Sequence, residues 1–317
     1  MNKINYLIFK IFGFKRHNIL KISDKAIELI IKQIEIDGKN DFGKIWNNIL
    51  KKYKKTQNEF TDSKDNLYKI KTLFENFFVN GLSDGACVGS SLKNPRIFFK
   101  YLFRTRIRKY KVDKFDDFSC SIKHIKFDNL NYSPILNSGR PWLLNINGKF
   151  INPEFYDHYY FFKSIFNDYK KFKNCIFIGD GSGILSNFIL NNCKFEKVYF
   201  VDLPHFLIRQ AIVNSEINIK QIYLTPGQFL KAKISKGESY CIFNQDSFPE
   251  IKKQYLISYI KLFIRFKIKT IFSYNKKDLN SGHINFQKIL NDLNFKSIYC
   301  MESVIRKNYY IEKYSYD

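Results

Sequence analysis

Three glycines and an aspartate in the middle of the chain have the spacing of a nucleotide-binding site. Gly179, Gly181 and Gly183 alternate directly after a short apolar run. Glycine lets the backbone turn tightly and approach a ligand without a Cβ in the way, and a helix predicted from residue 184 aims its N-terminal amides at the same place. Asp202 ends the next apolar run, where a carboxylate accepts hydrogen bonds from a ribose diol. This pattern indicates a cofactor with a nucleoside part.

The glycine spacing distinguishes two cofactors that both have a ribose. A dinucleotide fingerprint needs GxGxxG, in which the third glycine allows close helix packing, whereas this chain has GxGxG followed by Ile184. The spacing favours S-adenosylmethionine over a nicotinamide dinucleotide, and a glycine turn that binds nothing is the structural alternative. The residues expected to bind the cofactor are Gly179, Asp180, Gly181 and Gly183 on the methionine and ribose side, Asp202 at the ribose diol, Leu203 at the adenine edge, and Asn244.

Methyl transfer to a hydroxyl requires a positioned acceptor and a group that removes its proton. A histidine, a carboxylate or a metal ion serves the second purpose. Asp246 follows the predicted strand SYCIFN, whose carboxyl end should meet the ligand, and it is the first candidate base. Its structural alternative is an N-terminal cap of the helix that follows. Glu250, near the start of that helix, is expected either to orient the substrate or to complement the helix dipole.

Two histidines are further candidates for the catalytic base. His158 lies in DHYYFF before the glycine turn, and His283 lies in DLNSGH after the fifth predicted strand, where a lid would carry either one over the cofactor. His205 follows Asp202 too closely to reach the methyl group, so we expect it to border the adenine. The sequence contains no HxH, HxxxH or DxD cluster; a divalent metal is compatible with the chemistry, but no ligand is assigned.

Alternating strands and helices are predicted to position these residues. Seven β-rich runs begin at residue 176, namely IFIG, KVYFVD, QIYL, YCIFN, TIFSY, SIYCM and NYYIEKY. Helix-length intervals separate them until the last two, which are close enough for an antiparallel hairpin. The pattern predicts an α/β fold with a doubly wound, Rossmann-like sheet of seven strands. We divide the chain into a mainly helical region 1–132, a connecting, substrate-side segment 133–170 and a cofactor-binding domain 171–317.

The region before residue 133 has several helical patterns. Ser23 and Asp24 precede the run AIELIIKQIEI as capping residues, and a second helix is predicted around residues 46–50. A third helix is predicted from apolar residues at helical spacing, which are Leu67, Ile70, Leu73, Phe74 and Phe77.

The chain of 317 residues has a formal net charge of +24, but its lysines are spread along the whole sequence. A solvated basic surface is therefore favoured over a nucleic-acid groove. The segment 96–111, RIFFKYLFRTRIRKYK, mixes basic and aromatic residues as a nucleic-acid platform does, yet an amphipathic helix explains it better. An RNA methyltransferase is the alternative function.

The sequence favours a cytoplasmic location. Its six cysteines form no CxxC pair, which suits a reducing compartment, and no apolar window is long enough for a spanning helix. Peripheral attachment at the inner membrane surface is the alternative for residues 5–21, NYLIFKIFGFKRHNILK.

Several motifs together resemble the sugar O-methyltransferase family, a class I S-adenosylmethionine-dependent group common in surface-polysaccharide gene clusters. They are GRPWLLNINGKFINP, FIGDGSGILS, VYFVDLP, and NQDSFPEI followed by YLISYIKLFIR. The most specific parts are VDLP and the pattern Asn244, Ser247, Glu250, and the resemblance runs from about residue 46 to the end. It implies strand order 3-2-1-4-5-7-6 and methyl transfer to a hydroxyl of a sugar, sugar nucleotide or polysaccharide.

The resemblance also implies an acceptor pocket and shows one departure from the family pattern. Together with the affinity of sugars for aromatic faces and planar hydrogen-bonding groups, it points to Arg140, Trp142 and Tyr159 as substrate contacts; core packing is the alternative for Trp142. Such methyltransferases usually have an acid two residues before the first glycine, where this chain has Phe177. We expect Asp180 to take over part of that role, and a catalytically degenerate binding protein is the alternative.

Overall fold

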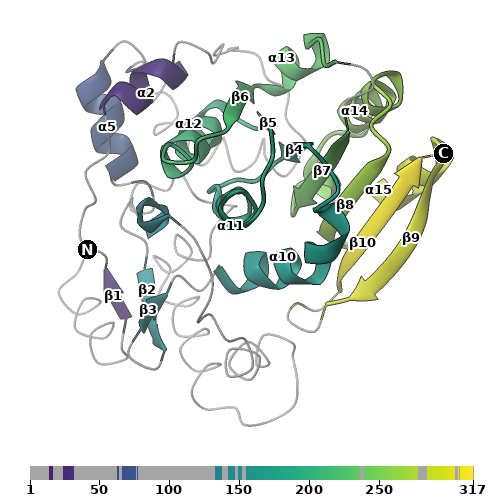
Figure 1. Ribbon diagram of the computed structural model, residues 1–317, viewed down its shortest axis with the longest axis horizontal. Coiled ribbons are helices and arrows are strands. Elements are labelled where there is room, and N and C mark those ends of the chain that lie inside the picture. The colour runs from purple at the N-terminus through teal and green to yellow at the C-terminus, as the bar shows by residue number, and fades with distance from the viewer. Residues whose placement is uncertain are drawn as a thin grey trace.

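Seven strands between residues 174 and 316 form one sheet in the computed structural model (Figure 1). The structure describes residues 14–16, 24–31, 63, 66–75, 77, 133–137, 142–146, 149–151, 155–235, 239–277, 284–303, 306 and 308–316. The strands are β4 (Asn174–Ile178), β5 (Lys197–Val201), β6 (Lys220–Leu224), β7 (Tyr240–Gln245), β8 (Thr270–Lys276), β9 (Phe295–Glu302) and β10 (Tyr309–Tyr316). Their order is β6-β5-β4-β7-β8-β10-β9, with β10 antiparallel to both neighbours. Counted along the chain this is 3-2-1-4-5-7-6, which confirms the predicted fold class.

Helices cover both faces of the sheet. One core cluster joins the sheet to α10 (Phe155–Tyr169), α11 (Ile184–Asn192) and α12 (Pro204–Val213). The other joins it to α13 (Pro226–Lys231), α14 (Lys253–Arg265) and α15 (Phe286–Asp292). Strand residues alternate between the clusters, since Phe177 belongs to the first while Ile176 and Ile178 belong to the second. The continuous apolar runs in the sequence therefore reflect strands buried on both faces.

Two of the three predicted N-terminal helices lie among the described residues. They are α2 (Asp24–Ile31) and α5 (Leu67–Glu75), and in Figure 1 both lie beside α12. Ile70, Phe74 and Phe77 are fully buried, and the Phe77 ring meets Phe206 of α12 edge-on at 6.3 Å between centroids. The helical spacing in the sequence thus marked the face that joins the main core. Ser23, the helix predicted at 46–50 and the segment 96–111 lie outside the described residues.

A small antiparallel sheet joins two distant parts of the chain. It contains β1 (Phe14–Arg16), β2 (Trp142–Ile146) and β3 (Lys149–Ile151), and β1 pairs with β2. Part of the predicted interfacial segment 5–21 is therefore a strand. Among the helices of the described ranges, none has the length and apolar character needed to cross a membrane.

A row of stacked aromatic rings crosses five adjacent strands on the face covered by α10, α11 and α12. Phe177 on β4 stacks between Phe200 on β5 and Phe243 on β7, with ring centroids 5.6 Å and 5.1 Å away. Tyr223 on β6 extends the row at 4.7 Å from Phe200, and Phe272 on β8 extends it at 5.5 Å from Phe243. These residues are register partners, so the ladder of backbone pairs and the row of rings coincide.

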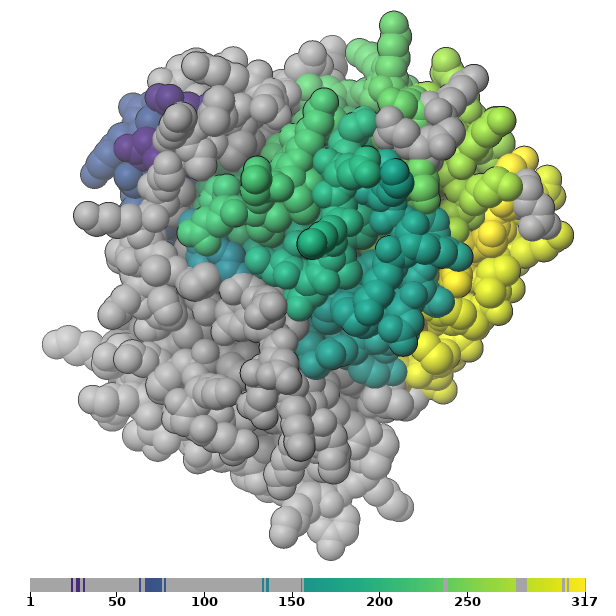
Figure 2. Space-filling model, in the orientation of Figure 1, coloured from purple at the N-terminus to yellow at the C-terminus, as the bar shows by residue number. Residues whose placement is uncertain are grey.

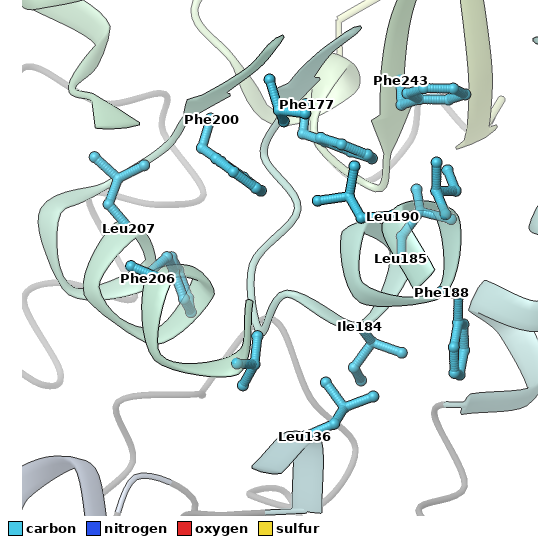
Figure 3. Packing of buried hydrophobic residues seen from close by; sticks show 14 of the residues in the cluster. Leu136, Phe177, Ile184, Leu185, Phe188, Leu190, Phe200, Phe206, Leu207 and Phe243 are labelled. Atoms are coloured by element: carbon cyan, nitrogen blue, oxygen red, sulfur yellow. The ribbon is translucent and has the colours of Figure 1, made fainter. Parts of the chain in front are cut away.

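Figure 3 shows Phe200, Phe177 and Phe243 between the strands and helices α11 and α12. From α10, Tyr169 meets Phe243 edge-on at 5.5 Å. Phe177, which stands where the resemblance described above implies an acid, is thus a central member of the core and only 1% exposed. α10 falls in the segment expected to connect two domains, yet it packs directly on the sheet. The proposed division into three regions remains a prediction.

We predict that replacing Phe177 by alanine lowers the free energy of unfolding by about 3–5 kcal/mol, because the change removes a fully buried ring and leaves a cavity between two stacked partners. Phe177→Asp should cost still more, since it adds a buried charge without a partner. Urea unfolding followed by circular dichroism measures both. Tyr68→Ala, at a side chain that is 79% exposed, is the control and should change stability by less than about 0.5 kcal/mol. A Phe177→Asp variant as stable as the wild type would contradict the assignment.

Candidate functional site at the carboxyl edge of the sheet

The glycine turn that follows β4 is closely packed on both sides. Gly179 has φ +68°, and a Cβ built on it would lie 2.1 Å from the Ser247 Oγ. Gly183 has φ +81° and precedes the first residue of α11, and its Cβ would lie 2.6 Å from the Val213 Cγ2. Both positions therefore require glycine, for the left-handed backbone and for the close approach of neighbouring side chains. The turn leads β4 directly into the N-terminus of α11, as predicted.

Asp202 connects the end of β5 to this turn. Its Oδ2 accepts hydrogen bonds from the Gly181 backbone N–H at 2.9 Å and from the Gln210 Nε2 at 2.7 Å. Its Oδ1 accepts one from the Leu203 backbone N–H at 2.8 Å. Burial raises the pKa of Asp202 to about 6, although these three hydrogen bonds favour the charged form. Each carboxylate oxygen has two lone pairs, so Oδ1 retains one for a ligand.

Leu203 and His205 occupy the start of α12, close to Asp202. Leu203 is the residue that precedes the first turn of this helix, and its side chain is buried in the core. His205 is also buried, with its ring centroid 4.3 Å from that of Phe206, and burial lowers its pKa to about 4. Both residues follow the carboxyl end of β5, and their predicted contact with the adenine stays a prediction.

Asp180 does not point where we expected. Its carboxylate faces the first turn of α11, with the Ser186 backbone N–H 3.4 Å from Oδ1 and 3.3 Å from Oδ2. Burial raises its pKa to about 8, the nearby charge of Asp202 adds to that rise, and the hydrogen bonds from Ser186 oppose it. Asp180 therefore accepts a hydrogen bond from a free backbone N–H in the first turn of α11. This geometry does not support its predicted role as a replacement for the acid missing at Phe177.

Asn244 at the end of β7 is completely buried and holds neighbouring segments together. Its Nδ2 donates to the Ile178 carbonyl at 2.8 Å, and its Oδ1 accepts from the Phe248 N–H at 3.1 Å and from the Asn275 Nδ2 at 2.7 Å. These bonds set the distance between the glycine turn and the loop after β7. Asn244 is thus engaged in contacts within the protein, and its contact with a cofactor stays a prediction.

Asp246 forms an ion pair that the sequence did not indicate. Its Oδ2 lies 2.5 Å from the Arg306 Nη1, and the same nitrogen lies 3.5 Å from the Asp157 Oδ2. Asp246 also has φ +57°, a left-handed conformation that is uncommon outside glycine and clusters at functional sites. The predicted alternative, a helix cap, is wrong, because α14 begins at Lys253 and Lys252 precedes it without a capping side chain.

His158 lies beside this ion pair. Its Nδ1 is 2.9 Å from the Gln245 Oε1, and burial lowers the pKa of the ring to about 4, while the charge of Asp246 acts in the opposite direction. The structure therefore brings together two of the three predicted bases, His158 and Asp246. Gln245, which belongs to the motif NQDSFPEI but was not predicted as a site residue, joins them together with Arg306, which no motif contained. His283 lies outside the described residues.

The predicted acceptor contacts are less well placed. Tyr159 is 7% exposed, and its ring packs near Phe162 and Phe188 in the core, which does not support a contact with a sugar. Glu250 lies in a short 3-10 helix, Phe248–Glu250, directly after the loop that contains Asp246. Arg140 lies outside the described residues, and of Trp142 only the backbone, in β2, is described.

The described part of the chain has no group of three or more His, Cys, Asp or Glu side chains that could hold a metal ion. In the orientation of Figure 2, teal and green parts of the chain lie toward the viewer, and the yellow C-terminal strands lie at their margin.

No protein-family model and no curated protein matches the sequence. Solved structures with a similar arrangement include the PH0226 protein from Pyrococcus horikoshii OT3, at 17% identity and a TM-score of 0.42 over 52% of this chain and 92% of that one. Magnesium protoporphyrin IX methyltransferase from Synechocystis PCC 6803, solved with bound SAH, is 14% identical at 0.40, covering 52% and 84%. Ribosomal protein L11 methylase from Lactobacillus delbrueckii subsp. bulgaricus is 14% identical at 0.39, covering 52% and 80%. These similarities concern the fold.

We predict that Gly179→Ala destabilises the protein and that Ser247→Gly partly rescues it. The new Cβ overlaps the Ser247 side chain, so removing that side chain relieves the overlap and leaves about 1–2 kcal/mol of left-handed backbone strain. Urea unfolding of the two single variants and the double variant gives the coupling energy. Strictly additive effects would show that the two residues do not touch.

We also predict a pH dependence of stability that originates at Asp180. An unfolded aspartate titrates near pH 3.9, at about its reference value, whereas folded Asp180 titrates at about 8. Between these values the native state holds a proton that the unfolded chain has lost, so the free energy of unfolding should fall as the pH rises. Asp180→Asn keeps an oxygen facing Ser186 but does not titrate. The free energy of unfolding of this variant, relative to that of the wild type, should therefore be greater at pH 8 than at pH 5.

Urea unfolding at pH 5, 6.5 and 8 measures this difference, with the exposed Asp292→Asn as the control. If Asp180→Asn and wild type show parallel pH profiles, Asp180 is not the source of the dependence.

Proposed function

We propose that this chain is a methyltransferase that transfers the methyl group of S-adenosylmethionine to a hydroxyl of a sugar, in the synthesis of a surface polysaccharide or of its nucleotide-linked precursor. One observation carries the proposal. The glycine turn after β4 is bound through the Gly181 N–H to Asp202 at the end of β5, and it opens into the N-terminus of α11. In a doubly wound sheet, ligands bind at this carboxyl edge.

Two buried polar atoms at the turn suit such a ligand. Within the described structure, the Ser182 Oγ and the Gln210 Oε1 are buried without a hydrogen-bond partner. Ser182 belongs to the glycine turn, and the Nε2 of Gln210 bonds both Asp202 and the Gly181 carbonyl, at 2.7 Å and 3.1 Å. A hydroxyl or ammonium group of a bound cofactor would satisfy both atoms. When bound, the cofactor supplies an electrophilic methyl group.

The acceptor side of the proposed site contains two candidate bases. Asp246 is held by Arg306, so its carboxylate is already engaged with a positive charge. His158 has one ring nitrogen bound to Gln245, and no hydrogen bond to its Nε2 is seen in the described ranges. We therefore favour His158 as the group that accepts the hydroxyl proton, with Asp246 beside it to stabilise the imidazolium. His283 remains a candidate.

The proposed sugar contacts follow from the resemblance rather than from the geometry. Arg140, Trp142 and Glu250 remain the proposed substrate residues, and Tyr159 is withdrawn because it is buried. A cytoplasmic location is supported by Cys175 and Cys241, which are buried free thiols.

We predict that Asp202→Asn weakens the binding of S-adenosylhomocysteine about 10-fold or more. The amide keeps the shape of the carboxylate but replaces one acceptor oxygen by a donor. The new N–H groups then face either the Gly181 N–H at the Oδ2 position or the Leu203 N–H and the proposed ribose contact at the Oδ1 position. Isothermal titration calorimetry measures the affinity, and a thermal melt without ligand shows whether the variant is folded. The exposed Asp292→Asn is the matched control. Failure of the wild-type protein to bind this ligand would favour a degenerate binding protein.

The substrate class is tested separately, with labelled S-adenosylmethionine and a panel of sugar nucleotides. Methylation of RNA instead, with an affinity that falls steeply as salt rises, would favour the alternative function.

A further inference from the structure

Gln245 and His158 meet because the two-residue period of strand β7 and the helical period of α10 turn both side chains toward the same interface. Gln245 lies two residues after Phe243 on β7, so its side chain is on the same face of the sheet, toward α10. On α10, the residues Phe155, Phe162, Ile165 and Tyr169 are buried at helical spacing, and His158 falls on the same stripe between the first two. The imidazole therefore points at the sheet from a position that an apolar residue would normally occupy.

The contact between the two side chains determines which ring nitrogen carries a proton. An amide oxygen only accepts hydrogen bonds, so the 2.9 Å contact between the Gln245 Oε1 and the His158 Nδ1 is a hydrogen bond donated by Nδ1–H, which requires a proton on Nδ1. In a neutral imidazole, the lone pair then lies on Nε2. We propose that Gln245 is a positioning residue that holds His158 in this tautomer, so that Nε2 is the atom that accepts the proton of the acceptor hydroxyl. The inference rests on the proposed function for the identity of that proton.

The proton balance of this step is simple. The hydroxyl proton moves to Nε2, which turns neutral His158 into an imidazolium, and Nδ1–H remains bonded to the Gln245 Oε1 throughout. The proton then passes from Nε2 to water, which restores the neutral ring. Because Gln245 is 4% exposed and belongs to a strand, its amide has little freedom to turn away during these events.

The charges around His158 favour glutamine over glutamate at position 245. Asp157 on α10 and Asp246 after β7 lie on either side of Arg306, and Tyr274 and Tyr309 complete the group. The carboxylates outnumber the guanidinium by one, and the charge of Asp246 partly offsets the burial that lowers the pKa of His158. A carboxylate at 245 would add a second excess negative charge and keep the ring protonated to higher pH. The neutral amide orients the ring without that effect.

The tautomer is tested directly by NMR on the full chain labelled with ¹⁵N-histidine, without cofactor or substrate. Ring nitrogen shifts distinguish protonated from unprotonated nitrogens, and His158→Gln identifies the signals. We expect the wild type to show protonated Nδ1 and unprotonated Nε2 at pH 7. In Gln245→Leu the two tautomers should mix, whereas in Gln245→Glu the single tautomer should persist and the ring should titrate at higher pH. Gln254→Leu, on the exposed surface of α14, should leave the signals unchanged.

An unprotonated Nδ1 in the wild type, or an unchanged tautomer in Gln245→Leu, would overturn the inference. Because no methyl donor is present, this result does not depend on whether methyl transfer occurs. Once a substrate is found, Gln245→Glu should move the acid limb of the kcat profile to higher pH, and Gln245→Leu should lower kcat about 10-fold or more with little change in KM. A pH profile of Gln245→Glu identical to that of the wild type would also contradict the positioning role.

Discussion

The row of aromatic rings across β6, β5, β4, β7 and β8 is the interaction on which the rest of the structure depends. Each ring stacks on its register partner, so the rings fix the heights of the five parallel strands relative to one another. The next residue of each strand on the same face lies two positions further on, at the carboxyl edge. Those residues are Gly179, Asp202, Thr225, Gln245 and Tyr274. The stacked rings that fix the register of the sheet therefore also fix the relative positions of the residues at its carboxyl edge.

This arrangement gives a physical reason for the phenylalanine at position 177. An acid there would interrupt the row between Phe200 and Phe243 and place a charge in a fully buried layer. The chain keeps its polar groups one level higher, where Asp202 binds the glycine turn and Gln245 binds His158. The row of rings thus stabilises the sheet, and the adjacent row at the carboxyl edge contains the polar residues.

Much of the fold followed from the sequence, because each strand is a short apolar run with turn-forming residues at its ends. Spacing alone also indicated the three glycines that have a left-handed backbone, Gly179, Gly181 and Gly183. The direction of the Asp180 side chain was not predicted correctly. A carboxylate inside a tight turn can face either a ligand or the helix that follows, and the backbone angles of the turn decide between them. The contact of Gln245 with His158 was not predicted, although the motif NQDSFPEI contains Gln245, since the contact depends on α10, which comes from a different part of the sequence. Its partner did carry a signal, because His158 lies on the apolar stripe of that helix.

Arg306 shows why the rest of the site depends on topology. It lies between β9 and β10, and β10 runs antiparallel between β8 and β9, so the beginning of β10 lies at the same edge as the ends of the parallel strands. The Tyr274 Oη, hydrogen-bonded to the Ser303 Oγ at 2.8 Å, ties this connection to β8. Arg306 then reaches Asp246 and Asp157, one from the sheet and one from α10. Because Arg306 occupies both carboxylates, His158 is the neighbouring proposed base without an ion pair among the described residues. The reversed order of the last two strands thereby determines which side chain is proposed for proton transfer.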